Sequence, residues 1–414
     1  MSKIKIVGHA SGSGILTIAA PNTDTDRTIT IPDVTGTLLD SGSDLPAANL
    51  TGTVADARIS ALTASKLTGA LPAISAANLT AIPAANITGT LPAISGANLT
   101  GVRDTTGGRK NLFINGGFDV WQRGTSLAGA TSYLADRWFN GTTETQSRQT
   151  FTVGQTDVSH NPTYYHRGSS GSTEWYGIKQ KVENVGITAS REVTLSYWAK
   201  GSSAFTNAPF RGQYFGSGGS SAVSAALSTA SITTSWARYT HTFTLPSISG
   251  KTVGDGSYMQ INLIRANVNN ITIDLANCQL EFGSVATDFE HRSYGEELAL
   301  CQRYYYNISN NSSDSSIMNG NYYSSTAFYG HINFPVSMRS PSSITLVVST
   351  GADYFKIHSN GTVQTFDGTG LTIYRRHENG ATLYTSSLAS STQGTGGWFM
   401  FTNASAKLAF SCEL

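Results

Sequence analysis

Hydrophobic and polar residues alternate with a period of two through long stretches of the chain after residue 104. In the segment VTLSYWAKG, which begins at Val193, the odd-numbered positions start with valine, leucine and tyrosine, whereas the even-numbered ones start with threonine, serine and tryptophan. A period of two is typical of a β-strand with one buried side and one solvent-facing side. About eight such segments lie between residues 104 and 292, and they predict a two-sheet sandwich with a hydrophobic core.

The last part of the chain, residues 304–414, has the same alternation in shorter segments. Extended segments are expected at 353–358, 362–366, 371–376 and 381–386. They are separated by three dipeptides that tolerate the positive φ of tight hairpin turns, namely Asn360-Gly361, Asp367-Gly368 and Asn379-Gly380. This order predicts a four-stranded meander within a second, smaller β-sandwich.

One helix is expected between the two sandwiches. Ser293 and Glu296 have the spacing of a capping box, in which the two side chains satisfy backbone N–H groups of the first helical turn. The pattern predicts a helix from Glu296 to about Arg303, within a short connector over residues 293–303. The fold class that these elements predict is all-β.

The beginning of the chain predicts a small β-module over residues 1–44. Alternating segments at Ile15–Ile18 and Thr28–Ile31 are separated by a polar turn. Pro32-Asp33 and Gly36 then end the second segment.

Residues 45–103 are repetitive. LPAISAANLT at 71–80 returns as LPAISGANLT at 91–100, and LPAANLTG at 45–52 returns as IPAANITG at 82–89. Proline and glycine interrupt every possible helical turn, and glycine does not occupy every third position as collagen requires. Short extended segments with one apolar stripe are the structure that remains.

Such a stripe cannot be buried by one chain alone, so the repeats predict a slender shaft of three parallel copies. Its inward positions would be Leu50, Leu67, Leu79, Ile87 and Leu99. A disordered linker rich in alanine, threonine and serine is the alternative interpretation. A linker of that kind would not need the recurring aliphatic residues.

Composition limits the partners of the chain. Charged residues make up 13 %, about half the usual ~25 %, and the formal net charge is +1, so nucleic acid is not an expected partner. No apolar run has the ~18 residues of a membrane span or the form of a signal peptide, so we expect neither membrane insertion nor export by that route. Cys278, Cys301 and Cys412 are scattered, which predicts reduced thiols, no metal site and no cofactor.

Few residues have the spacing of a catalytic site. Lys251 and Thr252 imitate the end of a phosphate-binding loop, but Leu245 stands where that motif needs a glycine. Asp274 and Glu281 are the best carboxylate pair for a glycosidase, yet residues seven apart point to opposite faces of an unbroken strand. The sequence therefore predicts no catalytic residue.

Three motifs in order resemble carbohydrate-binding-module jelly-rolls: NLFINGGF at 111–118, SYWAKG at 196–201 and QLEFGSVATDFE at 279–290. The bacteriophage versions of this domain are the most similar, including FEHRSYGEELALCQRYY at 289–305. The resemblance implies a glycan-binding jelly-roll over residues 104–292. Members of the family often bind glycans on aromatic platforms and some hold a structural calcium, but no motif places either site here.

Residues 14–39, GILTIAAPNTDTDRTITIPDVTGTLL, resemble a short module near the start of bacteriophage tail-fibre and other virion proteins. The resemblance implies a homotrimeric tail fibre of the virion, assembled in the host cytoplasm and docked on another phage protein through residues 1–44. Its heads would adhere to a host cell-surface glycan and perform no covalent chemistry. A polysaccharide-degrading tail spike and a non-adhesive virion decoration protein are the alternatives.

If residues 1–44 hold the virion, the far end of the chain meets the cell. There the 371–386 hairpin carries Tyr374, Arg376 and His377 beside its turn, and Trp398 follows a glycine-rich segment. Aromatic rings beside fixed donors suit hydroxyl-rich or acidic glycans, so these four residues are the candidate contacts. An ordinary solvated hairpin is the alternative.

Other aromatic residues are given structural roles. Trp138 and Trp198 stand in alternating segments and are expected in the core. The run Tyr304–Tyr306 cannot face one way, so at least one of its rings is expected to be exposed or at a subunit contact.

The unburied apolar stripe of residues 45–103 predicts a trimer in solution. Light scattering of the purified protein should give three times the 43.8 kDa mass of the chain. A stable monomer or dimer would remove the reason to expect a shaft.

Overall fold

The computed structural model describes residues 109–129, 131–141, 145–170, 175–268, 270–309, 312–386, 388–389 and 391–414, together with scattered positions between 7 and 28. Most of the expected module at 1–44 and the whole expected shaft at 45–103 lie outside the described residues. The five expected trimer-core residues, Leu50, Leu67, Leu79, Ile87 and Leu99, are among those outside.

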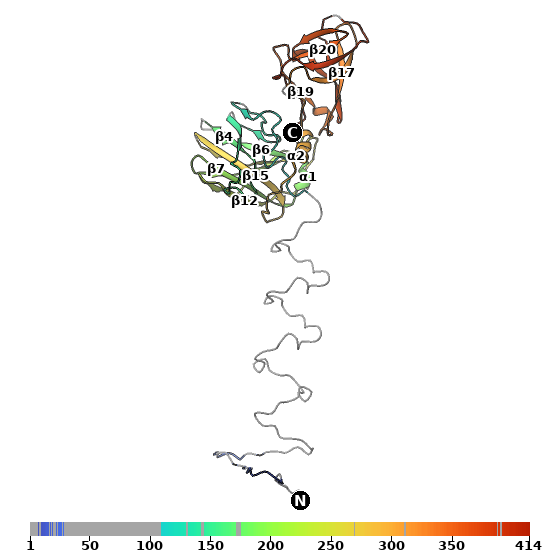
Figure 1. Cartoon of the computed structure of the whole chain (residues 1–414). Helices are drawn as coiled ribbons and strands as arrows, with labels where there is room; N and C mark the ends of the chain where they lie inside the picture. The colour runs from blue at the N-terminus through green and yellow to red at the C-terminus, as the bar shows by residue number, and fades with distance from the viewer. Residues whose placement is uncertain are drawn as a thin grey trace. The chain divides into compact units, whose positions relative to one another are not determined.

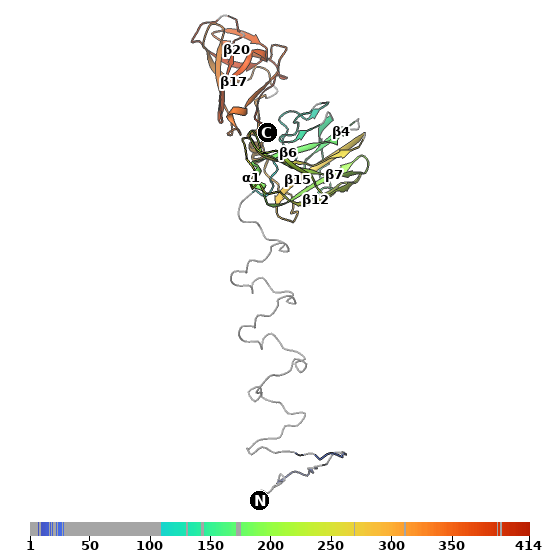
Figure 2. The same ribbon diagram turned by 180° about the vertical axis from the view of Figure 1, so that it is seen from behind.

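The described part of the chain is almost entirely β-structure, which confirms the predicted all-β class (Figures 1 and 2). Strands β1 to β15 form one domain, called the jelly-roll domain below, and strands β16 to β25 form the C-terminal domain. Helical structure in these residues is limited to four short elements: α1 (Val185–Thr188), α2 (Tyr294–Gln302) and the 3₁₀ turns η7 (Pro341–Ser343) and η8 (Gly368–Gly370).

The jelly-roll domain contains two main antiparallel sheets. The six-stranded sheet has the order β1 (Ser126–Leu127), β3 (Thr145–Thr150), β4 (Tyr164–Ser170), β15 (Ile271–Phe282), β7 (Glu192–Gly201) and β12 (Ala237–Thr244). The five-stranded sheet has the order β10 (Val223–Ala226), β9 (Phe210–Tyr214), β13 (Tyr258–Asn262), β6 (Ile178–Glu183) and β2 (Phe139–Asn140). Two further pairs join β11 (Ala230–Ile232) to β8 (Phe205–Asn207) and β14 (Ala266–Asn267) to β5 (Trp175–Tyr176).

The alternation read from the sequence places the core of this domain. Val193, Leu195 and Tyr197 on β7 are fully buried between the sheets, as predicted. Trp138 is also fully buried, with its indole 5.2 Å from the ring of Phe113. The prediction for Trp198 is wrong, because its neighbours Tyr197 and Ala199 occupy the core face and leave this ring half-buried on the outer face.

Helix α2 follows the jelly-roll domain and begins two residues earlier than predicted. Ser293 is its N-cap, and the Ser293 hydroxyl accepts a hydrogen bond from the backbone N–H of Glu296 at 3.4 Å. The side chain of Glu297 is buried, where it accepts from the backbone N–H of Asn115 at 2.5 Å and lies 3.4 Å from Arg292. These contacts attach the helix to the jelly-roll core.

The C-terminal domain has two sheets around its own core. The seven-stranded sheet has the order β21 (Thr362–Phe366), β20 (Phe355–Ser359), β24 (Gly396–Phe401), β17 (Ser316–Tyr322), β18 (Phe328–Asn333), β23 (Gly380–Thr385) and β22 (Leu371–His377). The three-stranded sheet has the order β16 (Tyr305–Asn307), β25 (Leu408–Ser411) and β19 (Thr345–Val348). A cluster of phenylalanine and aliphatic side chains, including Phe355, Phe399 and Phe410, is buried in this domain.

The predicted meander is only half right. β20 pairs with β21 and β22 pairs with β23, so the turns at Asn360-Gly361 and Asn379-Gly380 are present. The Asp367-Gly368 turn is not a hairpin, because β21 and β22 lie at opposite edges of the sheet. Asp367 instead caps η8 by accepting from the N–H of Thr369 at 2.8 Å.

Steric crowding explains why residue 368, which was predicted to lie in a hairpin turn, is a glycine. A Cβ atom on Gly368 would lie 2.2 Å from the carbonyl oxygen of Ser349. The residue is therefore a glycine because of close backbone packing, which a sequence cannot distinguish from the conformational need of a tight turn.

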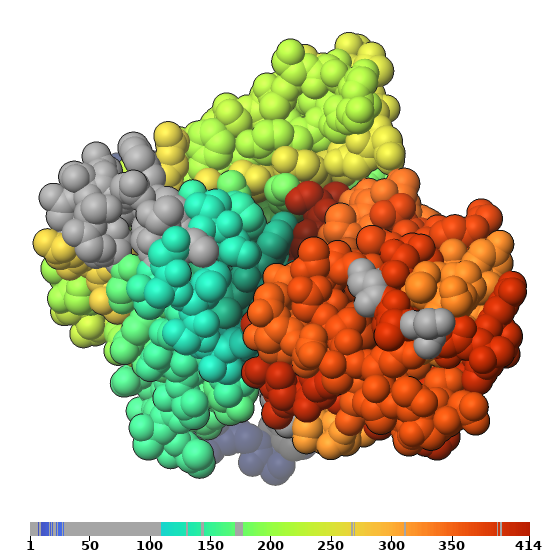
Figure 3. Space-filling view, turned by 90° about the horizontal axis from the view of Figure 1, so that it is seen from above, coloured from blue at the N-terminus to red at the C-terminus, as the bar shows by residue number. Residues whose placement is uncertain are grey.

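A charged cluster joins the two domains, and their surfaces touch in the space-filling view (Figure 3). The carboxylate of Glu413 pairs with Arg123 at 2.9 Å and also with Arg137. The Arg137 guanidinium lies 3.4 Å from the ring centroid of Tyr304, and the Arg123 guanidinium lies 3.6 Å from that of Tyr305. These five residues are called the Glu413 cluster.

The Glu413 cluster accounts for two of the three rings of Tyr304–Tyr306. Tyr304 and Tyr305 are buried against the arginines, and Tyr306 is half-buried against the C-terminal core. Tyr306 is therefore the ring of this run that stays partly exposed. Arg137 is 1 % exposed, and a buried cation of this kind is strongly destabilising without a partner. The jelly-roll domain therefore depends on a residue from the end of the C-terminal domain.

Burial of His166 makes the stability of the jelly-roll domain sensitive to acid. Its ring lies 5.5 Å from Phe118 and 6.2 Å from Trp121, and one ring nitrogen is 3.2 Å from Oε1 of Gln146. Burial lowers the pKa of His166 to about 3. Because the unfolded chain takes up this proton near pH 6.5 and the folded one does not, stability is lost as pH falls below that value.

We predict that the free energy of unfolding falls by about 2 kcal/mol between pH 7 and pH 5 through His166 alone. Chemical denaturation at the two pH values measures the effect. His166→Gln cannot take up a proton, so its stability should change less over the same interval. An equal pH dependence in the variant and the natural chain would show that this group is not responsible.

Candidate functional site

The predicted contacts of the 371–386 hairpin are separated by a β-bulge. Ile373 pairs with Leu383 and Arg375 with Thr382, so Tyr374 is an extra residue between them. The bulge changes which later side chains share the face of Tyr374. Arg376 comes to lie opposite the buried Ala381, and its Nε donates to the backbone oxygen of Ile344 at 3.0 Å. The predicted grouping of Tyr374 with Arg376 is therefore wrong.

Tyr374 belongs instead to a group of tyrosines that the sequence analysis missed. The ring of Tyr329 is 5.0 Å from Tyr374, 4.8 Å from Tyr384 and 5.2 Å from Tyr323. The Arg375 guanidinium lies 5.0 Å from the ring centroid of Tyr374. Tyr374 and Tyr323 are more than half exposed, so an aromatic surface with one cation lies on the outer face of this sheet.

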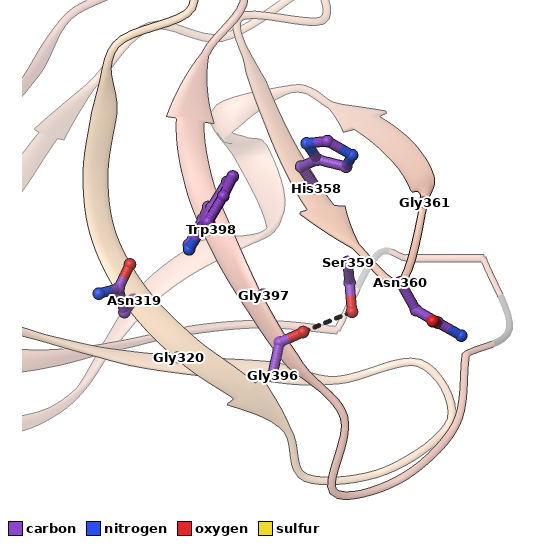
Figure 4. A pocket seen from close by; sticks show the side chains of 9 residues that line it. All are labelled: Asn319, Gly320, His358, Ser359, Asn360, Gly361, Gly396, Gly397 and Trp398. Atoms are coloured by element: carbon purple, nitrogen blue, oxygen red, sulfur yellow. Dashed lines mark hydrogen bonds between the residues drawn. The ribbon is translucent and has the colours of Figure 1, made fainter.

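Trp398, on β24, is four strands away from Tyr374 on β22, a distance of roughly 19 Å at the usual strand spacing. Its register partners are Asn319 on β17 and His358 on β20. Trp398 is 55 % exposed, and the His358 ring stands almost perpendicular to it at 5.9 Å. Figure 4 shows the three side chains on adjacent strands, with Trp398 between the other two.

These residues line a pocket of about 450 Å³. The remaining lining residues are the turn at the end of β20 and three glycines, namely Ser359, Asn360, Gly361, Gly320, Gly396 and Gly397. The hydroxyl of Ser359 donates to the backbone oxygen of Gly396 at 2.6 Å, which links the turn to the strand that carries Trp398 (Figure 4). The volume lies within the usual range for small-molecule sites.

The pocket belongs to a longer line of side chains across the seven-stranded sheet. Pairing places Val363 beside His358, His358 beside Trp398, and Trp398 beside Asn319. Gly320 pairs with Gly330, so the line continues to His331 on β18, and then to Thr382 and Arg375. We call these residues the cross-strand row. It spans roughly 29 Å on the outer face.

Of the four residues predicted as contacts, Trp398 is the one that lines the pocket described above. His377 is exposed, and its ring is 6.5 Å from that of His331, which belongs to the cross-strand row. Asn319, His331 and His358 were missed. Their positions in alternating segments indicate exposure, but only the strand order brings them beside Trp398.

A second polar and aromatic surface is the outer face of the five-stranded sheet in the jelly-roll domain. Tyr214 pairs with Tyr258, and their rings stack at 4.7 Å and 21°. The next positions on this face are Gln260 and Asn262, whose side chains are hydrogen-bonded at 2.9 Å. Phe210 pairs with Asn262 and extends the face toward β10. We call this surface the tyrosine face.

Two lysines add positive charge to the tyrosine face. The Lys181 ammonium lies 4.5 Å from the ring centroid of Tyr258 and donates to the backbone oxygen of Leu414. Burial, followed by the nearby charges of Lys179 and Arg137, lowers the pKa of Lys181 to about 8. Burial also lowers the pKa of Lys179. Both lysines are partly desolvated donors beside aromatic rings.

Asp274 and Glu281 do not lie as the sequence predicts, because β15 is bulged between Ala276 and Gln279. The bulge puts both carboxylates on the same outer face, opposite Lys200 and Thr194 of β7. These two partners are six residues apart, so the carboxylates are separated by about 20 Å. That distance is well beyond the roughly 5–9.5 Å of a glycosidase pair.

Each of these carboxylates also has structural partners. Asp274 is 2.7 Å from Nε of Arg167 and 3.7 Å from Nζ of Lys200. Glu281 accepts from the backbone N–H of Thr287 at 2.9 Å and from its hydroxyl at 2.6 Å. In the described residues, both acids therefore stabilise the fold around β15.

The part of the chain that the structure describes contains no cluster of histidine, cysteine, aspartate or glutamate with the geometry of a metal site, and the three cysteines are buried free thiols. It also contains no helix long and apolar enough to cross a membrane.

Comparison with known proteins gives one family match. Residues 110–254 match the family described as carbohydrate binding domain, CBM_4_9. The matched segment covers β2, β6, β9 and β10 of the sheet that carries the tyrosine face. The chain therefore contains a jelly-roll domain of the carbohydrate-binding type. No curated protein matches the chain.

Several solved structures are weakly similar. The CBM22-1 xylan-binding domain from Paenibacillus barcinonensis Xyn10C has 12 % identity and a TM-score of 0.27, covering 39 % of this chain and 94 % of that one. A family 22 carbohydrate-binding module of Clostridium thermocellum Xyn10B has 14 % identity and a TM-score of 0.27, covering 36 % and 89 %. The enzymatically active domain of tailspike protein 4 from bacteriophage CBA120 has 14 % identity and a TM-score of 0.24, covering 42 % and 21 %. TM-scores this low do not indicate a shared ligand or activity.

Proposed function

We propose that this protein is a non-catalytic adhesion subunit of a bacteriophage tail fibre, which binds a glycan on the host cell surface. The observation that carries the proposal is the match of residues 110–254 to a carbohydrate-binding family. Glycan binding is the function of the jelly-roll domain, and the fibre is the structure that presents it.

The tyrosine face has the chemistry that sugar recognition needs. A pyranose ring has an apolar side made of C–H groups and a rim of hydroxyls. The partly exposed rings of Tyr214, Tyr258 and Phe210 suit the apolar side, whereas the half-buried Asn262 and Lys179 can donate to the hydroxyls. Because these groups come from adjacent strands of one sheet, they form a preformed surface.

The fibre context is supported by residues outside the described part of the chain. Residues 14–39 resemble a virion module, and the repeats of residues 45–103 favour a trimeric shaft. Three linked copies of a weak glycan site would bind a cell surface far more tightly than one, because the second and third contacts are intramolecular. A trimeric fibre is therefore a useful carrier for the tyrosine face.

We predict that the full-length protein binds at least one member of an array of bacterial surface oligosaccharides and polysaccharides. Tyr258→Ala and Tyr214→Ala remove one ring each and should weaken that binding by about tenfold or more, since aromatic rings that become buried on binding are frequent hot spots. Biolayer interferometry on the immobilised glycan gives the affinities. Intact trimer mass and thermal melting should be unchanged.

Val153→Ala provides the control for these variants, because Val153 is fully exposed and lies outside the tyrosine face. It should bind like the natural chain. A protein that binds no glycan of the array would favour the alternative of a non-adhesive virion decoration protein. Equal loss of binding in the control variant would contradict the assignment of the site to the tyrosine face.

We also predict that the protein releases no reducing sugar from any polysaccharide that it binds. The separation of about 20 Å between Asp274 and Glu281 is too large for the paired acids of a glycosidase. A reducing-end assay after prolonged incubation measures the release. Sugar release above that of a heat-inactivated sample would support the polysaccharide-degrading tail spike instead.

A further inference from the structure

We infer that the C-terminal domain carries a second, independent glycan site, in which one pyranose ring of a surface oligosaccharide stacks on Trp398 above Gly396. The inference rests on the proposed adhesive function but concerns another domain, which the family match does not cover. Four features of the pocket support it.

The first feature is the exposed indole. Trp398 is 55 % exposed, whereas the next residue, Phe399, is fully buried, so the largest side chain of β24 is directed to solvent. An exposed aromatic ring offers apolar area whose burial by a ligand is favourable. The perpendicular His358 ring contacts Trp398 on one side and leaves the pocket side open (Figure 4).

The second feature is the bare strand position beside Trp398. Gly396 lies on the same face, and its φ is not in the positive range that favours glycine. A Cβ atom there would meet only the backbone oxygen of Gly320, at 3.8 Å, which is an ordinary contact. Neither backbone conformation nor packing therefore requires this glycine, and a larger side chain would instead fill the pocket.

Two neighbouring glycines, unlike Gly396, are required by close packing. A Cβ on Gly320 would lie 2.0 Å from the oxygen of Tyr329, and one on Gly330 would lie 2.6 Å from the sulfur of Met318. Those two glycines are explained by close packing inside the domain. Gly396 is the one of the three whose missing side chain opens space for a ligand.

The third feature is the ring of polar groups around that space. Asn319 on one side and Asn360 on the other carry exposed amides, each with donors and an acceptor. The His358 ring adds a further donor or acceptor. A sugar ring that lies on the indole would direct its hydroxyls outward toward these groups, as carbohydrate recognition requires.

The fourth feature is the direction in which the polar surface extends from the pocket. The cross-strand row continues from Asn319 to His331, Thr382 and Arg375, all on the same outer face. An extended oligosaccharide could therefore lie across the strands beyond the first ring. The surface suits a chain of sugars more than a compact small molecule, and it suits a hydrophilic ligand more than a second protein subunit.

The test uses the full-length protein on the same array of bacterial surface glycans. Trp398→Ala removes the stacking ring and Gly396→Val fills the pocket, so each should reduce binding to at least one array glycan by about tenfold or more. Trp398→Phe should retain most of that binding because it keeps an aromatic face. Gly396→Val adds atoms and removes none. A loss of glycan binding in this variant would therefore come from the filled pocket and not from a lost contact.

Two controls accompany these variants. Gly295→Ala is a matched glycine substitution, because Gly295 also has open space at its Cβ position and no positive φ. Val347→Ala removes an exposed apolar side chain from the opposite sheet of the same domain. Both should bind like the natural chain, and all variants should keep the trimer mass and melting temperature.

The outcome separates this inference from the proposed function. If Tyr258→Ala loses glycans that Trp398→Ala and Gly396→Val still bind, and no glycan depends on Trp398, the jelly-roll domain alone recognises sugars and this inference is wrong. Binding of no glycan at all contradicts both. A change of oligomeric mass in Trp398→Ala would mean that the indole contacts a second copy of the chain, which also overturns the inference.

Discussion

A β-strand can bury only one of its two faces in a sandwich, and this constraint determines both domains of the protein. On β7 the buried face carries Val193, Leu195 and Tyr197, so the six-stranded sheet has its core there. On the five-stranded sheet the same alternation leaves Tyr214 and Tyr258 outside, and on the seven-stranded sheet it leaves Trp398 outside. Since the core already has its own aromatic residues, the rings on outer faces are available for a ligand.

The sequence predicts the features that depend on local chemistry. Alternation identifies the buried face of β7, Ser293 marks the beginning of α2, and the Asn-Gly dipeptides give two hairpins. The failures arise where one extra residue or a distant contact decides the result. Bulges in β15 and β22 reverse the direction of every later side chain, which regroups Glu281 with Asp274 and separates Arg376 from Tyr374. The order of the strands in a sheet also cannot be predicted from local sequence patterns, so His358 and Asn319 could not be placed beside Trp398.

The Glu413 cluster couples the stability of the two domains. Glu413 supplies the charge that Arg137 needs in its buried position, and Tyr304 covers the same guanidinium. A truncation near Arg303 would remove both partners and leave the cation uncompensated. Loss of glycan binding in such a fragment could then reflect a damaged jelly-roll domain, whereas single substitutions on outer faces avoid that ambiguity.

The central claim is that sugars bind on outer sheet faces, and a crystal structure of the protein with its tightest array glycan tests it most directly. We expect sugar density over Tyr214 and Tyr258 on the five-stranded sheet, with or without a further ring beside Trp398. Density confined to the six-stranded sheet around Asp274, or to the junction at the Glu413 cluster, would contradict the account.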